Sequence, residues 1–405
     1  MEPWRKNLYI LWSTQFVSML GISFISPFLP FFIRDLGVTD EHELARWSGL
    51  TFAGPFFVSF FMVPIWGWLG DRYGRKLMIV RATYGLAVAQ VLVGLSQSVE
   101  QLFIFRMLQG SVSGFIPAAL ALTSASTPKE RSGYAIGVLQ TAISAGTVVG
   151  PLVGGVLADA FGFRPIFFIV AGMFMINGIF VIKGVKEIRT DEDQPRRYRF
   201  IDNYTYALTG PNIRLALILI VASQIAIGMV HPIFALFVES LDVSKAYLAT
   251  IAGAIFSTAA VFTVFSAPWW GKRNDRMGYR RNLLIASSIA GLTLIAHAAA
   301  PHALVLLPLR AALGFCLGGI IPPLYSFISK QTEAHRRGAI MGIASSSYIL
   351  ANVIGPPSGG IVAAHFGLQT AFVVSGAVLL LTTTLIWKFL QDRTKPGDGV
   401  MLVDD

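Results

Sequence analysis

The chain alternates between long apolar runs and short polar interruptions over its whole length. Residues 50–69 carry no charge, and neither do residues 82–99. Uncharged apolar runs of about 18 residues or more are typical of transmembrane helices. The pattern predicts twelve spans, at 8–33, 47–69, 77–97, 101–124, 133–158, 165–185, 213–238, 247–271, 282–300, 303–328, 338–364 and 369–390.

The longest polar stretch lies between the sixth and seventh predicted spans, at residues 186–212. Blocks of charge such as this one are usually solvated connections, and part of the stretch is a candidate for an amphipathic helix at the membrane interface. We therefore predict an N-terminal six-helix bundle at 1–185, a cytoplasmic linker at 186–212, and a C-terminal six-helix bundle with a short tail at 213–405.

The composition supports the same class of protein. Apolar residues make up 54% of the chain and charged residues 13%, whereas soluble domains are about a quarter charged. The first apolar run, from Asn7 to Ile33, is too long for a cleaved signal peptide. Cys316 is the sole cysteine, so the sequence offers neither a disulfide framework nor a cysteine metal cluster. We predict an all-α integral membrane protein.

The distribution of Lys and Arg predicts the orientation in the membrane. An even number of spans places both termini on one side, and most loop cations lie on that side. The opposite loops carry only four cations, Arg34, Arg46, Arg164 and Lys245. Since cytoplasmic loops carry the Lys/Arg excess, both termini are predicted to be cytoplasmic. The net charge of +10 then reflects topology, and we expect no nucleic-acid partner.

The two halves of the sequence match each other at a nearly constant offset. Pro27 aligns with Pro232 at an offset of 205, and Asp71 aligns with Asp275 at 204. "RSGYAIG" at 131–137 aligns with "RRGAIMG" at 336–342, and "GPLVGG" at 150–155 with "GPPSGG" at 355–360. The repeat predicts two pseudo-symmetric six-helix bundles, related by an axis along the membrane normal.

Three motifs identify a family. They are "GWLGDRYGRK" at 67–76, "RMLQGSVSG" at 106–114 and "GTVVGPLVGG" at 146–155. Together they resemble the loop 2–3, helix 4 and helix 5 motifs of the major facilitator superfamily, and more narrowly its twelve-helix drug:proton antiporter branch. The resemblance covers nearly the whole chain and implies the major facilitator fold. It also implies alternating access and, from the helix 5 motif, export.

The loop motif is a candidate conformational latch. The glycines permit a tight turn, and the resemblance implies that Asp71 contacts the start of helix 11, near Arg337 and Gly338, so that the cytoplasmic ends of the bundles are held together. The alternative is an ordinary cation-rich cytoplasmic loop, whose cations meet anionic lipid headgroups. The latch candidates are Gly67, Gly70, Asp71, Arg72, Gly74, Arg75, Lys76 and Asp275.

Two arginines lie inside predicted spans. Arg106 in helix 4 and Arg310 in helix 10 are each followed by glycines four and eight residues later. An intramembrane arginine is costly and requires a partner or a cavity, so we expect both to face the central cavity. The alternative is that their side chains snorkel to the outer headgroups.

Helices 5 and 11 are rich in glycine and proline. These residues are expected to kink the helices and to allow close packing against their neighbours. The positions concerned are Gly150, Pro151, Gly154, Gly155, Gly355 and Pro356.

No Asp or Glu lies near the middle of a span, which departs from exporters that carry deep acids. The remaining coupling candidates are Arg34, Asp35, Glu239 and His231. We hypothesise that Arg34 or Asp35 exchanges partners with Glu239 and Lys245 as an outer gate closes, although rim pairs are often only solvated surface charge. Histidine is the side chain that can change charge near neutral pH, which makes His231 a candidate, but a lone intramembrane His also serves as a donor to a backbone carbonyl.

The helices expected around the cavity carry few polar residues among many aromatic ones. The cavity candidates are Gln15, Phe16, Met19, Gln140, Gln224, Phe234, Tyr325, Tyr348 and Asn352. Such a lining suits small lipophilic or amphiphilic compounds.

The sequence therefore predicts an exporter of the bacterial inner membrane that exchanges protons for such compounds. The alternative is a dedicated exporter of one endogenous metabolite, such as a siderophore or a lipid-like molecule. No nucleophile–base constellation, metal site or P-loop is present, so neither an enzyme nor an ATP-driven pump is expected. We expect no cofactor and no metal, with the proton gradient as the energy source. The expected partners are the substrate, protons and the lipid bilayer, and a monomer suffices.

Overall fold

The computed structural model describes residues 2–128, 131–187, 200–333 and 336–390. Within these ranges twelve helical segments are long and apolar enough to cross a membrane, as the sequence predicts. Residues 188–199 of the predicted linker lie outside the described residues. The described part after them begins with the short helix α9 (Phe200–Thr209).

The first half of the chain forms one bundle. Its helices are α1 (Pro3–Ile25), α2 (Leu29–Asp35), α3 (Glu41–Tyr73), α4 (Arg75–Gly94), α5 (Val99–Ser111), α6 (Phe115–Ser126), α7 (Ser132–Phe161) and α8 (Phe163–Gly184). The second half forms the other bundle. Its helices are α10 (Pro211–Val230), α11 (Phe234–Glu239), α12 (Leu248–Met277), α13 (Tyr279–Ala298), α14 (Leu306–Leu317), α15 (Ile321–Gln331), α16 (Arg337–Phe366) and α17 (Leu368–Phe389).

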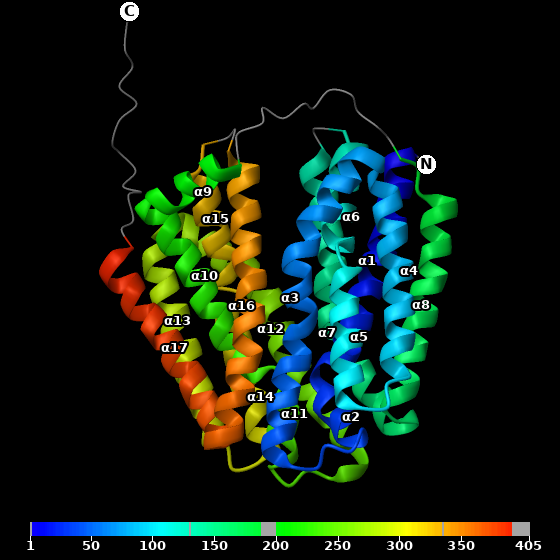
Figure 1. Ribbon diagram of the computed structural model, residues 1–405. Helices are drawn as coiled ribbons and strands as arrows, with labels where there is room; N and C mark the ends of the chain where they lie inside the picture. Colours follow the sequence, from blue (N-terminus) through cyan, green and yellow to red (C-terminus); the bar gives the residue numbers. More distant parts are fainter. Residues whose placement is uncertain (1, 129–130, 188–199, 334–335, 391–405) are drawn as a thin grey trace, which may run out of the picture.

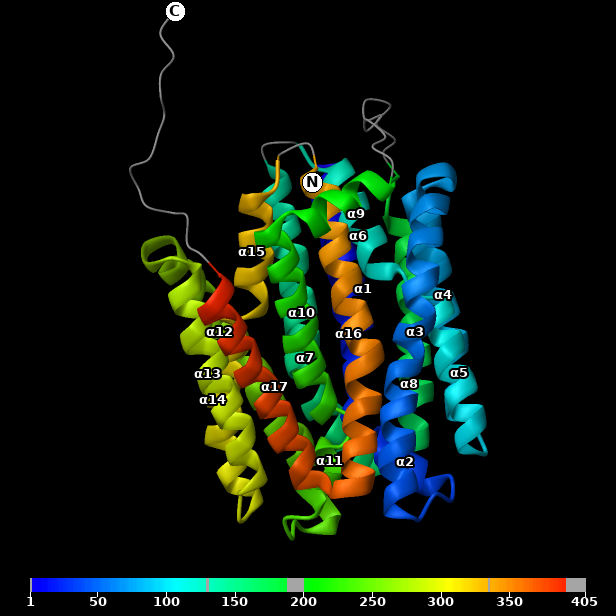
Figure 2. The same cartoon turned by 60° about the vertical axis from the view of Figure 1, so that its left-hand side comes forward.

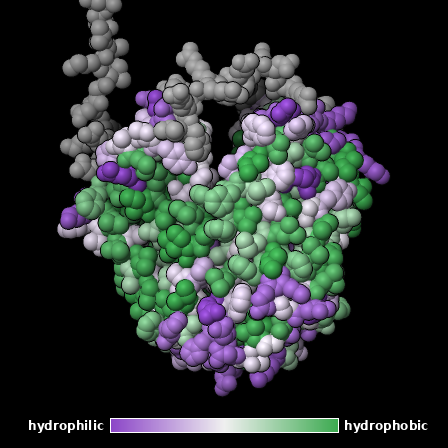
Figure 3. Space-filling model, viewed as in Figure 1, coloured by the Kyte–Doolittle hydropathy of each residue, from purple (hydrophilic) through white to green (hydrophobic). Residues whose placement is uncertain are grey.

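The two bundles stand side by side, as the colouring from blue to red makes clear in Figure 1. Across the interface α3 packs along α16 and α7 packs along α12, and Figure 2 shows α3 beside α16 from a second direction. The surface has an apolar band between two polar ends (Figure 3), which is the pattern expected of a membrane-spanning bundle.

Four predicted spans are each broken into two helices. Helix 1 is α1 and α2, helix 4 is α5 and α6, helix 7 is α10 and α11, and helix 10 is α14 and α15. At the helix 4 break Gly114 has a φ of 108°, in the left-handed region that favours glycine. The sequence predicts continuous spans at these four places, because an apolar run alone does not reveal a break.

Tryptophans satisfy backbone carbonyls at two of these breaks. Trp66 Nε1 donates to the Ser111 carbonyl oxygen at 2.7 Å, and Trp270 Nε1 donates to that of Phe315, also at 2.7 Å. These tryptophans and their acceptors are related by the repeat offset of 204. Because a buried carbonyl without a partner is costly in an apolar medium, these bonds stabilise the same break in both bundles.

The molecule has two ends, which we name by their loops. The terminal end carries the start of α1, the turn at Gly74 between α3 and α4, and the end of α17, and it is uppermost in Figure 1. The distal end carries the loops at residues 36–40 and 240–244. Helices α3, α7, α12 and α16 run between the two ends, so their contacts reveal which end is closed.

Candidate functional site: the interface between the bundles

Glycines bring the two bundles into backbone contact towards the distal end. A Cβ added at Gly49 on α3 would lie 2.5 Å from the Pro356 carbonyl oxygen, and one added at Gly360 would lie 2.5 Å from that of Ala45. On the other side of the interface, a Cβ at Gly155 of α7 would meet the Ala249 carbonyl oxygen. Since any larger side chain would push these helices apart, both helix pairs are closed at this end.

The same four helices are apart at the terminal end. An added Cβ would find no atom within 4 Å at Gly67, Gly133, Gly137, Gly271, Gly338 or Gly342. These glycines lie in the terminal-end parts of α3, α7, α12 and α16. The bundles also part at the upper end of the space-filling view (Figure 3). The structure is therefore closed distally and open towards the terminal end.

A charged pair joins the bundles at the distal end. Arg34 Nη1 and Nη2 donate to Glu239 Oε1 and Oε2, each at 2.8 Å. Glu239 is one of the partners hypothesised for Arg34 from the sequence. The structure shows this pair in the bidentate geometry that makes such pairs strong. No ion pair joins Asp35 to Lys245 among the described residues.

A second polar link at this end involves Asp159, at the end of α7. Its Oδ1 accepts from the Ala249 N–H at 3.1 Å, and its Oδ2 accepts from the Thr250 N–H at 2.7 Å. These N–H groups belong to the first turn of α12, where the helix dipole favours a carboxylate. His42 Nδ1 also contacts the Ala364 carbonyl oxygen, between α3 and α16. The distal closure therefore combines backbone packing with charge.

Asp71 makes no comparable contact at the terminal end. Its side chain is 76% exposed, and its one ion pair among the described residues is with Arg75 at 4.0 Å. Gly67 faces open space, while Gly70 packs against a side chain of α4. Arg72 lies over the ring of its neighbour Tyr73. The contact between Asp71 and helix 11 predicted from the family resemblance is not made in this conformation.

The rest of the loop motif is organised within its own bundle by Glu187. The Arg75 N–H donates to Glu187 Oε1 at 2.6 Å, at the first residue of α4. Gly74 has a φ of 109°, and a Cβ there would lie 2.6 Å from both carboxylate oxygens. Arg75 and Lys76 also donate to backbone carbonyls, at 2.8 Å each, of Ala121 and Ile182. These glycines and cations therefore support a turn that leaves Asp71 exposed.

The second copy of the loop motif is paired differently. Lys330 Nζ donates to Asp275 Oδ1 at 3.0 Å. Both residues belong to the C-terminal bundle and are more than half exposed, so this pair does not join the bundles.

The two intramembrane arginines are buried, against the expectation that they line an open cavity or snorkel. Arg106 is 6% exposed, and its guanidinium donates to the Thr51 carbonyl oxygen at 3.3 Å and to Gln109 Oε1 at 2.8 Å. Arg310 is 3% exposed and lies over the Phe234 ring at 3.5 Å. Both side chains are thus covered by their own surroundings in this conformation.

Helices α7 and α16 run without interruption through their prolines. Neither helix is broken, so the kinks predicted for helices 5 and 11 stay a prediction, while breaks are found in helices 1, 4, 7 and 10. The small residues are used for close packing. Gly150 and Gly154 face α1, Gly155 faces α12, and Gly355 faces α10, where Gly228 lies against Pro356.

The predicted cavity residues differ in how far they are covered in this conformation. Gln15, Gln224, Phe234 and Asn352 are buried, while Phe16, Met19, Tyr325 and Tyr348 are half-buried and Gln140 is exposed. Both amide atoms of Gln15 lack a hydrogen-bond partner. His231 lies at the helix 7 break, where its ring is 6.1 Å from that of Phe52 and 5.4 Å from that of Phe256.

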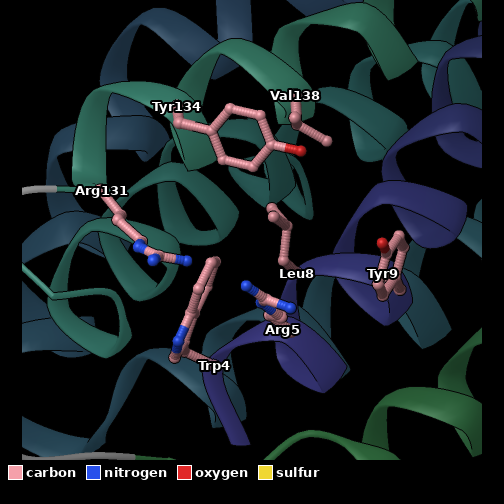
Figure 4. Close-up of a pocket in the computed structure, with 7 residues that line it drawn as sticks. All are labelled: Trp4, Arg5, Leu8, Tyr9, Arg131, Tyr134 and Val138. Atoms are coloured by element: carbon pink, nitrogen blue, oxygen red, sulfur yellow. The ribbon is translucent and has the colours of Figure 1, made fainter. Parts of the chain in front are cut away.

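A cavity of about 410 Å³ lies at the terminal end between α1 and α7. Trp4, Tyr9 and Tyr134 surround it together with Arg5 and Arg131 (Figure 4). Arg5 pairs with Glu2 at 3.2 Å. The cationic and aromatic lining of this cavity lies near the open terminal end of the interface. It was not predicted from the sequence.

A model of the Major Facilitator Superfamily matches residues 11–252 and 216–400. The chain belongs to the major facilitator superfamily. The two matched ranges each cover a large part of one bundle.

Curated members of the superfamily resemble the chain over nearly its whole length. It is 33% identical over 399 residues to the "Multidrug resistance protein MdtG" of Escherichia fergusonii, covering 97% of this chain and 96% of that protein. It is 35% identical over 395 residues to the protein of the same name from Rahnella sp., covering 96% and 95%. These relatives indicate a multidrug efflux transporter and not an enzyme.

Solved structures of superfamily members share the fold. A bacterial homologue of the human lysosomal transporter Spinster, in an inward-facing and occupied conformation, superposes with a TM-score of 0.81 at 17% identity, covering 98% of this chain and all of that one. A D-xylose–proton symporter superposes with a TM-score of 0.76 at 15% identity, covering 95% and 98%. At these identities the likeness establishes the fold of this multi-pass membrane protein.

Two residues of the site, Asp159 and Glu187, were not predicted. Each accepts hydrogen bonds from the backbone of a helix that is distant in the sequence. Because every residue type except proline has a backbone N–H, no sequence motif marks such a donor. The one available signal was their position, since each is an acidic residue at or just beyond the end of an apolar span.

Proposed function

We propose that the chain is a secondary exporter of the bacterial inner membrane that exchanges protons for small lipophilic or amphiphilic compounds by alternating access. The observation that carries the proposal is that the same four helices are in contact towards one end and apart at the other. Rocking of the two bundles would reverse this arrangement. The multidrug resistance relatives support the direction and kind of transport.

The Lys/Arg distribution supports a cytoplasmic terminal end, with both termini inside. In that orientation the structure faces the cytoplasm and is ready to receive a compound for export. One chain holds both bundles, so a monomer suffices, with protons and the substrate as its partners in the bilayer. No cofactor takes part, because the proton gradient supplies the energy.

We place proton coupling at the distal gate and not in the middle of the membrane. No acidic residue lies in the middle of a span, whereas Glu239 and Asp159 both join the bundles at the distal end. A proton on Glu239 would remove the charge that holds Arg34, so proton binding and gate position are linked. Asp35 and His231 remain the other candidates.

The test is export from proteoliposomes that contain the purified chain and a lipophilic fluorescent dye, with and without a pH gradient. We expect the gradient to accelerate transport, and we expect Asp35→Asn, Glu239→Gln or His231→Ala to remove that acceleration. If all three variants keep full proton-dependent transport, the coupling assignment is wrong. If the wild-type chain moves no dye under either condition, the exporter proposal is wrong.

A further inference from the structure

Arg310 is a buried cation without an acceptor. It is 3% exposed, and its Nε and Nη2 atoms have no hydrogen-bond partner. No ion pair involves it among the described residues. A buried guanidinium normally carries a carboxylate or several hydrogen bonds, because leaving it unpaired in an apolar medium is costly.

The repeat supplies a matched comparison in Arg106. That arginine occupies the equivalent position of the N-terminal bundle, and Gln109 Oε1 accepts from its Nη1 at 2.8 Å. The residue equivalent to Gln109 is Leu313, at the same offset of 204. The acceptor that one bundle supplies internally is therefore absent from the other.

The surroundings of Arg310 are aromatic and lie at the interface of the bundles. Its guanidinium is 3.5 Å from the centre of the Phe234 ring and 5.4 Å from that of Phe256. The Phe256 ring is 5.4 Å from that of His231, which in turn is 6.1 Å from the ring of Phe52 in the other bundle. We call Arg310, Phe234, Phe256, His231 and Phe52 the Arg310 cluster.

Neighbouring helices supply no compensating charge. Helices α12 and α13 both pack against α14, and neither carries an Asp or Glu between Leu248 and Gly271 or between Asn282 and Ala298. His297 on α13 uses Nδ1 on the Thr293 carbonyl at 2.7 Å and makes no hydrogen bond to Arg310. The cluster thus combines one positive charge that lacks an acidic partner with aromatic rings.

We propose that the Arg310 cluster binds the acidic group of an amphiphilic organic anion, such as a monocarboxylate with an aromatic or alkyl body. The carboxylate would supply the acceptor that Leu313 does not, and the rings of Phe52, Phe234 and Phe256 would contact the apolar body. This inference rests on the proposed export function and specifies its substrate class. Helix breaks at both Phe234 and the end of α14 make local rearrangement around an arriving ligand feasible.

Leu313→Gln tests the proposal without removing the charge. It copies the Gln109 arrangement and gives Arg310 an internal acceptor, while Leu313→Met has a similar shape and provides none. We would measure binding of 4-phenylbutyrate, 4-phenylbutan-1-ol and 4-phenylbutyltrimethylammonium to the full-length chain in detergent by calorimetry. The three probes share one body and differ in charge.

The wild-type chain and Leu313→Met should bind phenylbutyrate at least tenfold more tightly than the alcohol or the cation. Leu313→Gln and Arg310→Gln should weaken phenylbutyrate binding by roughly tenfold or more, the scale of one hydrogen bond to a charged group. Equal affinity for all three probes would overturn the proposal. So would unchanged phenylbutyrate binding in Leu313→Gln, because the carboxylate would then not be the acceptor that Arg310 lacks.

Transport of the same probes separates this proposal from the exporter proposal. Gradient-driven export of the alcohol or the cation, without export or binding of phenylbutyrate, would overturn the anion site and leave the exporter intact. Selective binding of phenylbutyrate that depends on Arg310, without transport of any probe, would support the site and contradict the exporter.

Discussion

Asp71→Asn is expected to abolish most transport while the protein still inserts and folds. In the state whose terminal end is closed, we expect the Asp71 carboxylate to meet the first turn of α16, where Gly338 now faces open space. Such a contact is worth about 0.3–2 kcal/mol, so its loss changes the balance of the two states by up to roughly 30-fold. Since Asp71 is now 76% exposed, its loss costs the observed state little.

The measurement is the initial rate of export by Asp71→Asn in proteoliposomes, compared at equal amounts of inserted protein. Asp275→Asn is the matched control, because Asp275 occupies the equivalent loop but pairs with Lys330 inside one bundle. We expect the control to keep most of its activity. A normal transport rate for Asp71→Asn would contradict the latch and favour the alternative, that residues 67–76 are an ordinary cytoplasmic loop.

Asp159→Ala is expected to have the opposite effect and to open the distal end. The substitution removes both hydrogen bonds to the first turn of α12, at 3.1 and 2.7 Å. Hydrogen bonds to a charged group contribute about 1.5–3 kcal/mol each when buried and less when partly exposed. A loss of about 2 kcal/mol would raise the population of the distally open state roughly 30-fold.

Distances measured by electron paramagnetic resonance between spin labels at Thr39 and Ser244 would report this opening. Both positions are exposed in distal loops of different bundles, and Cys316 is replaced by Ser to avoid a third label. Asp40→Ala is the control, because Asp40 caps α3 through the Glu43 N–H at 2.9 Å within one bundle. It should cost about 1 kcal/mol of stability with no change in the distance. An unchanged distance in Asp159→Ala would contradict its gating role.

The twelve spans and the two bundles could be predicted from the sequence because both depend on composition and repetition. Each apolar run is long enough to cross a bilayer, and the repeat keeps its register from Pro27 to Gly155. The breaks in helices 1, 4, 7 and 10 could not be predicted in the same way. They depend on partners such as Trp66 and Trp270, whose hydrogen bonds replace those missing from the helix.

The sequence predicted those contacts of the site in which side chains of opposite charge occupy equivalent positions of the two repeats. It did not predict the contacts made to the backbone. Arg34 and Glu239 lie at the same place in the repeat, and the structure joins them. Asp159 and Glu187 accept from backbone N–H groups, which cannot be recognised from the residue types in the sequence. Arg106 and Arg310 were predicted to behave alike, but one differs because Leu313 replaces the glutamine that accepts from the other.

The most direct test of the central claim, that closure of one end excludes closure of the other, is to measure both ends in the same variants. A second label pair at Ser124 and Gln331, both exposed at the terminal ends of α6 and α15, would report the terminal end. We predict that Asp159→Ala lengthens the distal distance and shortens the terminal distance in the same fraction of molecules, and that Asp71→Asn does the reverse. Distances that lengthen or shorten together at both ends would contradict alternating access.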